Sequence, residues 1–221
     1  MSLQELKQIV DTCTSCRLHQ NRKQALFGRG PTNATLMVVG EAPNKFDDES
    51  NDVFSGREGA HLNELLQVAG IPVESVYFAN VLKCKAEPGR QSDDCPAVCV
   101  GYLRTQIALI KPSVVVCAGK SALQHLLFPG TGHTVDVMIA WVGKHLRRRD
   151  LFGDMRFAVI YHPSYLQRNK SPADEELCLA TLADAWRFAT ARASGAASPP
   201  VVVEDLASSP VPMWQSRSLW R

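Results

Sequence analysis

The stretch from residue 36 to residue 59 constrains the fold of this chain more than any other. Residues 36–39 are four consecutive apolar residues, a pattern typical of a parallel strand that is buried on both faces. Gly40 and Pro43 end this strand, so Glu41 lies at its carboxyl end, where open α/β sheets place their chemistry. The pattern therefore predicts a site around Glu41. The alternative interpretation is an ordinary surface loop with a solvated carboxylate.

Strand and helix patterns alternate along most of the chain. Further strands are expected at residues 76–82, 114–118 and 157–161. Apolar residues at helical spacing are found at residues 3–12, after residue 59, after residue 95, at 123–128 and at 173–193. This alternation predicts a parallel sheet with helices on both faces. Between these elements, we expect the acidic residues 47–52 to form a polar loop and residues 135–150 to form a hairpin.

Composition divides the chain into two parts. Its 221 residues are 45% hydrophobic, which is enough for a sizeable core. We place one domain at residues 1–193. From Ser194 onward Pro, Ser and Ala are frequent, so a flexible tail is expected over residues 194–221. Trp214 and Trp220 in this tail are either idle or dock onto a protein partner.

Charge and hydropathy narrow the classes of function. The net charge is only +2, so any binding of nucleic acid has to come from local basic patches rather than from a global field. The chain has no run of about 18 apolar residues, and its first residues lack the apolar core of a signal peptide. We therefore expect a cytoplasmic, nucleoid-associated protein that acts as a monomer and has no membrane partner.

Seven cysteines in a cytoplasmic chain argue for metal binding or catalysis rather than for disulfides. Cys13 and Cys16 form a C-x-x-C pair, which alone is compatible with a redox site, a metal site or chance. Cys84 and Cys99 follow much later in the sequence, and Cys95 competes with Cys99 for the fourth place. Four thiolates hold either zinc or an iron–sulfur cluster. The wide second spacing favours a cluster over a zinc ribbon.

Several motifs follow one another in a fixed order. They are Cys13-x-x-Cys16-Arg-Leu, Val39-Gly-Glu-Ala-Pro43, Phe54-x-Gly-Arg-x-Gly59, Asn80-Val-Leu-Lys-Cys84, Cys99, Lys111-Pro and His162-Pro-Ser-Tyr-Leu-x-Arg168. Together, their order and spacing resemble one family, the family 4 uracil-DNA glycosylases. These are iron–sulfur members of the uracil-DNA glycosylase superfamily. The resemblance covers roughly residues 3–190, and the tail lies outside it.

The resemblance implies a fold and a cofactor. The fold is a three-layer α/β/α sandwich with a central four-stranded parallel sheet. The cofactor is a [4Fe–4S] cluster on Cys13, Cys16, Cys84 and Cys99, which in the family is regarded as structural. It pins the N-terminal segment and a loop that faces DNA.

The resemblance also implies a pocket for a base flipped out of DNA, because the glycosidic bond of uracil cannot be reached inside the duplex. Phe54 is then the aromatic floor under the uracil ring, and the backbone of Ala42 contacts uracil. Asn80 reads the base, because an amide donates to O4 and accepts from N3–H. Glu41 positions or activates water, and His162 donates to O2 of the departing uracil anion. Taken alone, Phe54 is equally compatible with a core residue, and His162 with a structural histidine at a strand end.

A second group of residues is implied to contact DNA outside the pocket. Leu166 is placed to wedge into the gap that the flipped base leaves, and Arg168 to hold the strand. Ser164 belongs to a tight loop that contacts phosphate. Further phosphate contacts are expected from Arg57, Lys83 and Lys85.

The predicted function is that of a monofunctional DNA glycosylase in base excision repair. It flips deoxyuridine out of DNA, hydrolyses the N-glycosidic bond and leaves an abasic site. An alternative is a protein that binds uracil-containing or damaged DNA with little turnover, because Asn44 and Ser55 depart from the family pattern. A third interpretation is an iron–sulfur or zinc interaction module that uses the tail to bind its partner.

Overall fold

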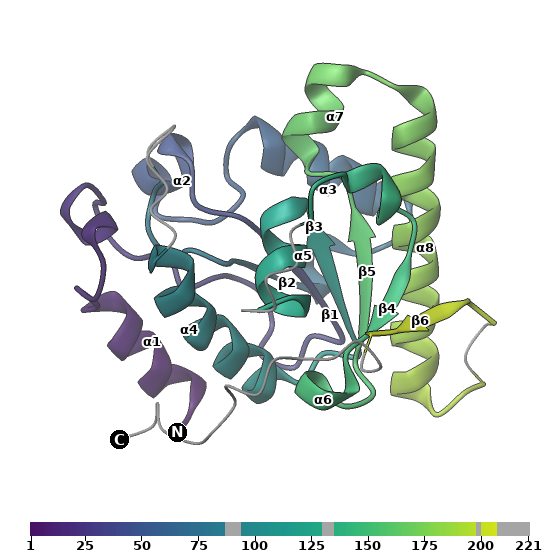
Figure 1. The fold of residues 1–221 in the computed structure, drawn as a ribbon, viewed down its shortest axis with the longest axis horizontal. Helices are drawn as coiled ribbons and strands as arrows, with labels where there is room; N and C mark the ends of the chain where they lie inside the picture. Colours follow the sequence, from purple (N-terminus) through teal and green to yellow (C-terminus); the bar gives the residue numbers. More distant parts are fainter. Residues whose placement is uncertain (87–93, 130–134, 198–199, 207–221) are drawn as a thin grey trace.

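A six-stranded sheet organises the fold, with its strands in the order β2-β1-β3-β5-β4-β6 (Figure 1). The computed structural model describes residues 1–86, 94–129, 135–197 and 200–206. The strands are β1 (Leu36–Gly40), β2 (Val76–Asn80), β3 (Val114–Ala118), β4 (His145–Arg147), β5 (Arg156–Ile160) and β6 (Val203–Asp205).

Helices cover both faces of the sheet, as the alternating pattern predicted. They are α1 (Leu3–Asp11), α2 (Lys45–Ser50), α3 (Arg57–Val68), α4 (Asp94–Ile110), α5 (Lys120–Leu127), α6 (Arg149–Phe152), α7 (Pro163–Asn169) and α8 (Pro172–Ser194). On one face, α8 packs on β1, β3 and β5 and contacts α3, which in turn contacts α7. On the other face, α5 packs on β1 and β3 and contacts α4, and α4 contacts α1. In the described part of the chain, no helix is both long enough and apolar enough to cross a membrane.

The four central strands are parallel and completely buried. Every residue of β1, β2, β3 and β5 is buried, which explains their continuous apolar runs. In the register of the sheet, Gly40 pairs with Asn80 and Ala118 pairs with Ile160. The carboxyl ends of the four strands therefore lie at one edge of the sheet.

The sheet is larger than the predicted four strands. The predicted hairpin at residues 135–150 is wrong, because β4 pairs antiparallel with β5 instead. The turn between them contains α6 and Gly153, which has a φ of +59°. Strand β6 pairs parallel with β4 and lies inside the segment expected to be a flexible tail. Trp214 and Trp220 lie outside the described residues.

The predicted polar loop at residues 47–52 is also wrong, because helix α2 occupies most of it. The Asn44 side chain accepts a hydrogen bond from the Asp47 N–H, and the Asp47 carboxylate accepts one from the Asn44 N–H, at 3.0 Å each. This reciprocal capping satisfies two backbone donors at the start of the helix. Asn51, with a φ of +59°, ends the helix in the left-handed conformation.

Candidate active site

The carboxyl edge of the parallel strands collects the side chains that the motifs singled out. Glu41 directly follows β1, and Asn80 is the last residue of β2. His162 comes two residues after β5, and Gly119 occupies the position directly after β3. Because the strands run parallel and in register, residues far apart in the sequence meet at this edge.

Gly40 is the point at which Asn80 and Phe54 approach the backbone of β1. A Cβ atom on Gly40 would lie 2.5 Å from Asn80 Oδ1 and 2.7 Å from Phe54 Cζ, which is closer than van der Waals contact allows. Both side chains are buried, and the Phe54 ring packs on Phe78 with 5.8 Å between centroids. Glycine at this position therefore places the amide and the aromatic ring together, at one place on the sheet edge.

The backbone of Phe54 is held in an unusual conformation. Its φ is +54°, which costs free energy for a residue with a side chain. A Cβ atom on Gly59 would lie 1.8 Å from the Phe54 carbonyl oxygen, so α3 packs directly against this backbone. Arg29 Nε donates to the neighbouring Val53 carbonyl at 3.0 Å. These contacts fix the ring where the sequence predicts the floor of a pocket.

His162 caps the N-terminus of α7 through its own ring. The Ser164 N–H donates to His162 Nδ1 at 3.2 Å, and the Ser164 hydroxyl lies 2.8 Å from the same atom. Because Nδ1 accepts, the neutral ring carries its proton on Nε2. Burial lowers the pKa of His162, and the charges of Glu41 and Glu58 oppose that shift only in part. A Cβ on Gly119, which has a φ of +94°, would lie 2.9 Å from His162 Cβ. The ring is therefore a neutral Nε2–H donor at neutral pH.

Glu41 is half-buried on the turn that leaves β1. The Leu82 N–H donates to the Glu41 carbonyl at 2.9 Å, and the Val81 N–H donates to the Gly40 carbonyl at 3.0 Å. These bonds extend the pairing of β1 with β2 by one step and fix the turn. The Glu41 carboxylate raises the pKa of His162 against the effect of burial, so its charge acts on the ring. A carboxylate and a neutral imidazole therefore share this edge.

Sequence reasoning missed a second histidine near Glu41. His125 lies on α5, the helix that follows β3, and its carbonyl accepts from Arg104 Nη2 at 3.4 Å. Burial lowers the pKa of His125, and the charge of Glu41 opposes this shift. The sequence feature that could have indicated His125 is its position on the helix that follows β3 and starts at the same edge of the sheet.

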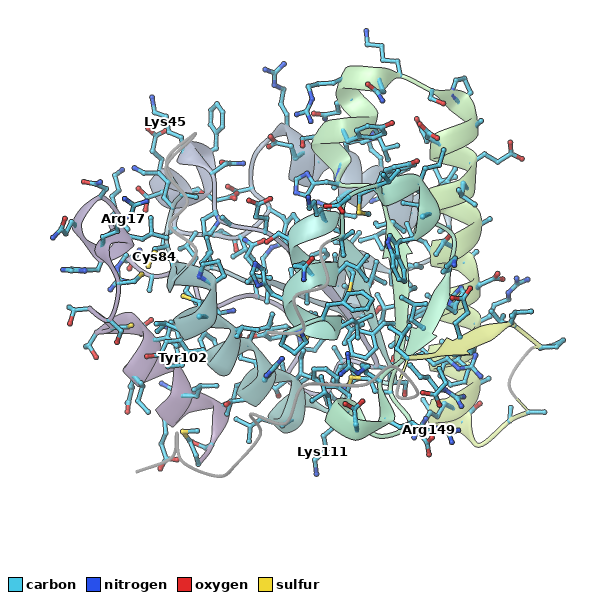
Figure 2. The ribbon with its side chains drawn as sticks, in the orientation of Figure 1. Arg17, Lys45, Cys84, Tyr102, Lys111 and Arg149 are labelled. Carbon is cyan, nitrogen blue, oxygen red and sulfur yellow. The ribbon has the colours of Figure 1, made fainter. Side chains whose placement is uncertain are left out.

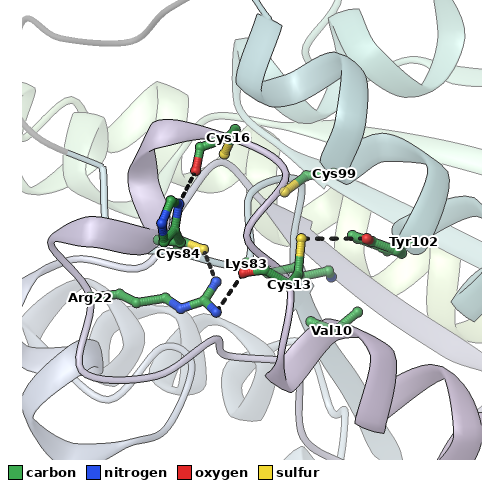
Figure 3. Close-up of a pocket in the computed structure, with 9 residues that line it drawn as sticks. Val10, Cys13, Cys16, Arg22, Lys83, Cys84, Cys99 and Tyr102 are labelled. Carbon is green, nitrogen blue, oxygen red and sulfur yellow. Dashed lines mark hydrogen bonds between the residues drawn. The ribbon is translucent and has the colours of Figure 1, made fainter.

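Four of the cysteines line one small cavity (Figure 3). Cys13 and Cys16 lie between α1 and the short 3₁₀ helix Arg17–Gln20, Cys84 lies after β2, and Cys99 lies on α4. In residues 1–86 and the other described ranges, no group of three or more His, Cys, Asp or Glu side chains is arranged to hold a single metal ion. The four thiols therefore line a cavity and are not arranged around the position of a single metal ion.

Hydrogen-bond donors reach two of these sulfur atoms. Arg22 Nη1 donates to Cys84 Sγ at 2.7 Å, and the Tyr102 hydroxyl donates to Cys13 Sγ at 3.4 Å (Figure 3). Burial raises the pKa of Cys84 and Cys99, and binding of a metal would oppose this shift because it displaces the protons of its thiol ligands. The donor set, four thiols with N–H and O–H groups around them, fits an iron–sulfur cluster.

Cys95 lies next to this cavity but does not line it. It is 1% exposed, against 3% for Cys99, and packs in the same small apolar cluster as Cys84 and Leu82. Burial and a hydrogen bond with Cys95 raise the pKa of Cys16 to about 12. The structure therefore places a fifth thiol against the four predicted ligands, one helical turn before Cys99.

Four of the residues predicted to contact DNA have polar groups near the carboxyl edge. Arg57 and Arg168 are exposed, on α3 and α7 respectively, and Gln167 Nε2 joins these helices by donating to the Arg57 carbonyl at 3.0 Å. Ser164 is bound to the His162 ring. Lys85 is half-buried, and its Nζ lies 3.1 Å from the Asp48 carboxylate.

The structure does not place Lys83 or Leu166 on the surface. Lys83 is 1% exposed, and its Nζ donates to Gln106 Oε1 at 2.6 Å and to the Asn80 carbonyl at 2.9 Å. Burial lowers its pKa to about 7. Leu166 is 3% exposed because α7 turns it into the main core. A phosphate contact by Lys83 and a wedge formed by Leu166 therefore gain no support from this structure and stay predictions.

Comparison with known proteins identifies the class to which this fold and edge belong. A family model described as the Uracil DNA glycosylase superfamily matches residues 27–185. The match contains the four parallel strands together with Glu41, Asn80 and His162. The chain therefore belongs to the uracil-DNA glycosylase superfamily.

Curated relatives narrow this membership. A protein named type-4 uracil-DNA glycosylase from Thermotoga maritima is 34% identical over 190 residues, which are 84% of this chain and 95% of the relative. A protein of the same name from Pyrobaculum aerophilum is 31% identical over 172 residues, which are 76% of this chain and 86% of the relative. Within the superfamily, the chain belongs to the type-4 uracil-DNA glycosylases, as its motifs predicted.

Proposed function

We propose that the protein is a monofunctional glycosylase that removes uracil from DNA and leaves an abasic site for base excision repair. The observation that carries this proposal is that Asn80 and Phe54 meet at Gly40 and that His162 lies against Gly119, all at the carboxyl edge of the sheet. An amide, an aromatic ring and a neutral imidazole donor are the groups that a flipped uracil requires.

The chemistry follows from the placement of these groups. The uracil ring stacks on Phe54, while the Asn80 amide donates to O4 and accepts from N3–H. The bond between C1′ and N1 breaks, and its electron pair leaves with uracil as an anion that the His162 Nε2–H stabilises at O2. A water oxygen bonds to C1′ and gives its proton to the Glu41 carboxylate, whose charge also opposes the developing positive charge on the sugar.

The cysteine cavity is proposed to hold a [4Fe–4S] cluster on Cys13, Cys16, Cys84 and Cys99. When bound, the cluster supplies four iron–thiolate links between segments that are far apart in the sequence. The protein's own contribution is to hold the loop between α1 and Arg22 against the residues after β2. Arg22 already makes this connection, because it donates to Cys84 Sγ and to the Cys13 carbonyl.

A protein that only binds damaged DNA gains no support from the geometry. Asn44, whose departure from the family pattern motivated this alternative, caps α2 and donates to Glu58 Oε2 at 3.0 Å. Ser55 donates to Asp47 Oδ1 through both its N–H and its hydroxyl group. Both residues are thus engaged in building α2, and the pocket side chains are intact.

Replacing Asn80 by alanine tests the proposal directly. A labelled oligonucleotide carrying one deoxyuridine is incubated with the protein and then treated with alkali, which cleaves at abasic sites. We expect cleavage by the wild type and a loss of roughly ten- to a hundredfold in Asn80→Ala, because two hydrogen bonds to uracil disappear. The matched control is Asn33→Ala, since Asn33 is exposed before the opposite, amino end of β1. No cleavage by the wild type would overturn the proposal.

A methyl group at Gly40 is expected to close the pocket. In Gly40→Ala the new Cβ would lie 2.5 Å from Asn80 Oδ1 and 2.7 Å from Phe54 Cζ, so at least one of them has to move. We expect excision to fall by roughly tenfold or more, since pocket geometry is held to within fractions of an ångström. Gly101→Ala on α4 is the control, because its Cβ meets no atom within 4 Å. Equal rates for the two variants would contradict the assigned pocket.

DNA is the partner that family membership supports. Action as a monomer, a cytoplasmic and nucleoid-associated location, and binding of a protein partner by the tail remain proposals. For the tail, the part that the structure describes includes β6, so a truncation that probes partner binding has to begin after residue 206.

A further inference from the structure

Phe46 is a large aromatic side chain that the structure leaves in solvent. Among the large apolar side chains exposed in the described residues, it is the aromatic one, with 58% of its surface exposed. A single exposed apolar residue needs no explanation by itself. The location of Phe46 is what requires one.

Phe46 lies close to the segment that carries Phe54. It is the second residue of α2, which starts shortly after Glu41 on the turn that leaves β1. A Cβ on Gly56, at the start of α3 and close to Phe54, would lie 3.4 Å from Phe46 Cβ. Figure 1 shows α2 at the same end of the molecule as α7, toward which the arrows of β3 and β5 point. The exposed ring is thus at the edge where a flipped base would enter.

The backbone that carries Phe46 is firmly held. Asn44 and Asp47 cap α2 reciprocally, and Asn44 Nδ2 donates to Glu58 Oε2 on α3 at 3.0 Å. The same Asp47 carboxylate accepts from the Ser55 N–H at 2.8 Å, which ties α2 to the segment containing Phe54. A backbone held in this way is already ordered before binding, so the cost in conformational entropy falls on the Phe46 side chain alone.

Charge around Phe46 fits a DNA strand. Lys45 projects from the upper left of the molecule in Figure 2, and 78% of its side chain is exposed. Its Nζ is 3.8 Å from the exposed Glu49 carboxylate, a long surface pair that contributes little free energy. Arg57 is exposed on the adjacent α3. Cations on the helix that carries the aromatic ring and on the adjacent helix match a base stack bordered by phosphates.

We propose that Phe46 stacks against the bases next to the flipped deoxyuridine and takes the wedge role that the sequence assigned to Leu166. The inference rests on the proposed function, because it needs a flipped base beside Phe46. It follows from the burial of Leu166 in the core and the exposure of Phe46 close to the segment that carries Phe54. A ring that replaces a missing stacking partner acts on duplex DNA, where stacking is lost on flipping.

The expected result is a loss that depends on the substrate. Phe46→Ala should lower single-turnover excision from duplex DNA by roughly ten- to a hundredfold, and should leave excision from single-stranded DNA almost unchanged, because a wedge fills a gap in the stack of a duplex. Phe46→Trp should restore the duplex rate, because the ring is what matters. Val68→Ala is the control, since Val68 is another exposed apolar residue, at the far end of α3.

A binding measurement separates failure of this inference from failure of the proposed function. A duplex carries a non-hydrolysable 2′-fluoro-deoxyuridine with 2-aminopurine beside it, and the fluorescence change on adding protein reports stacking next to the flipped base. A smaller change with Phe46→Ala than with Val68→Ala supports the inference, even if no variant excises uracil. Equal fluorescence changes, equal losses on both substrates, or loss only of self-association in size-exclusion chromatography would overturn it. No excision by the wild type from either strand form refutes the proposed function alone.

Discussion

Replacing His162 by alanine is expected to slow uracil release by roughly 10²- to 10³-fold while the fold stays intact. His162 carries its proton on Nε2 because Nδ1 accepts the Ser164 N–H at 3.2 Å. A donor fixed in this way stabilises the charge that develops on uracil O2 without having to reorient. The measurement is the single-turnover rate on an oligonucleotide with one deoxyuridine, and His61→Ala on α3 is the control histidine variant.

The pH profile distinguishes this role from a merely structural one. Burial lowers the pKa of His162 below its ordinary value, so the ring is neutral throughout the neutral range. Activity should therefore be level at neutral pH and fall only as pH drops through the lowered pKa, because protonated Nδ1 can no longer accept from Ser164. Folding stability changes with the same sign, since a depressed folded pKa gives stability that is present above the unfolded value and lost on acidification. An acid limb unchanged in His162→Ala would count against this assignment.

The central strands were predictable because their sequences are unambiguous. Residues 36–39 and 114–118 are continuous apolar runs, and only burial on both faces explains such runs. Strands β4 and β6 have three residues each, too few for a period to be visible, and they exist because β5 and β4 offer them a pairing edge. Helix α2 was missed because its acidic residues resemble a loop, although Asn44 and Asp47 already form a capping box.

In the candidate site, too, some features could be predicted from the sequence and others could not. The motifs predicted which residues matter around Glu41, and the parallel register explains why they meet. Side-chain direction could not be predicted: Lys83 turns inward because Gln106 on α4 offers it an acceptor, and Leu166 turns inward because it lies on the buried face of α7. The exposure of Phe46 is equally invisible in the sequence, because it depends on how α2 lies against α3.

Replacing Cys99 by serine is expected to remove the proposed cluster and to loosen the N-terminal segment, whereas Cys95→Ser should do neither. The two thiols are one turn apart on α4 and almost equally buried, but Cys99 lines the cavity and Cys95 does not. Iron content and visible absorbance measure the cluster. Because a group bound only by the folded state stabilises it, its loss should lower Tm by roughly 10 °C.

Loss of the cluster should also reach the pocket through a short path. Leu82 and Cys84 pack with Cys99 in one group of apolar side chains, and Ala42 packs against this group. The Leu82 N–H in turn donates to the Glu41 carbonyl at 2.9 Å. Residues before Arg22 should become sensitive to protease first, because Cys13 and Cys16 lose their links to the cluster while Arg22 keeps its hydrogen bond to Cys84 Sγ. Iron lost from Cys95→Ser and kept in Cys99→Ser would show that the fourth ligand is Cys95. Full iron in both variants would mean that either thiol completes the site, a redundancy made possible by a fifth thiol that lies next to the cavity.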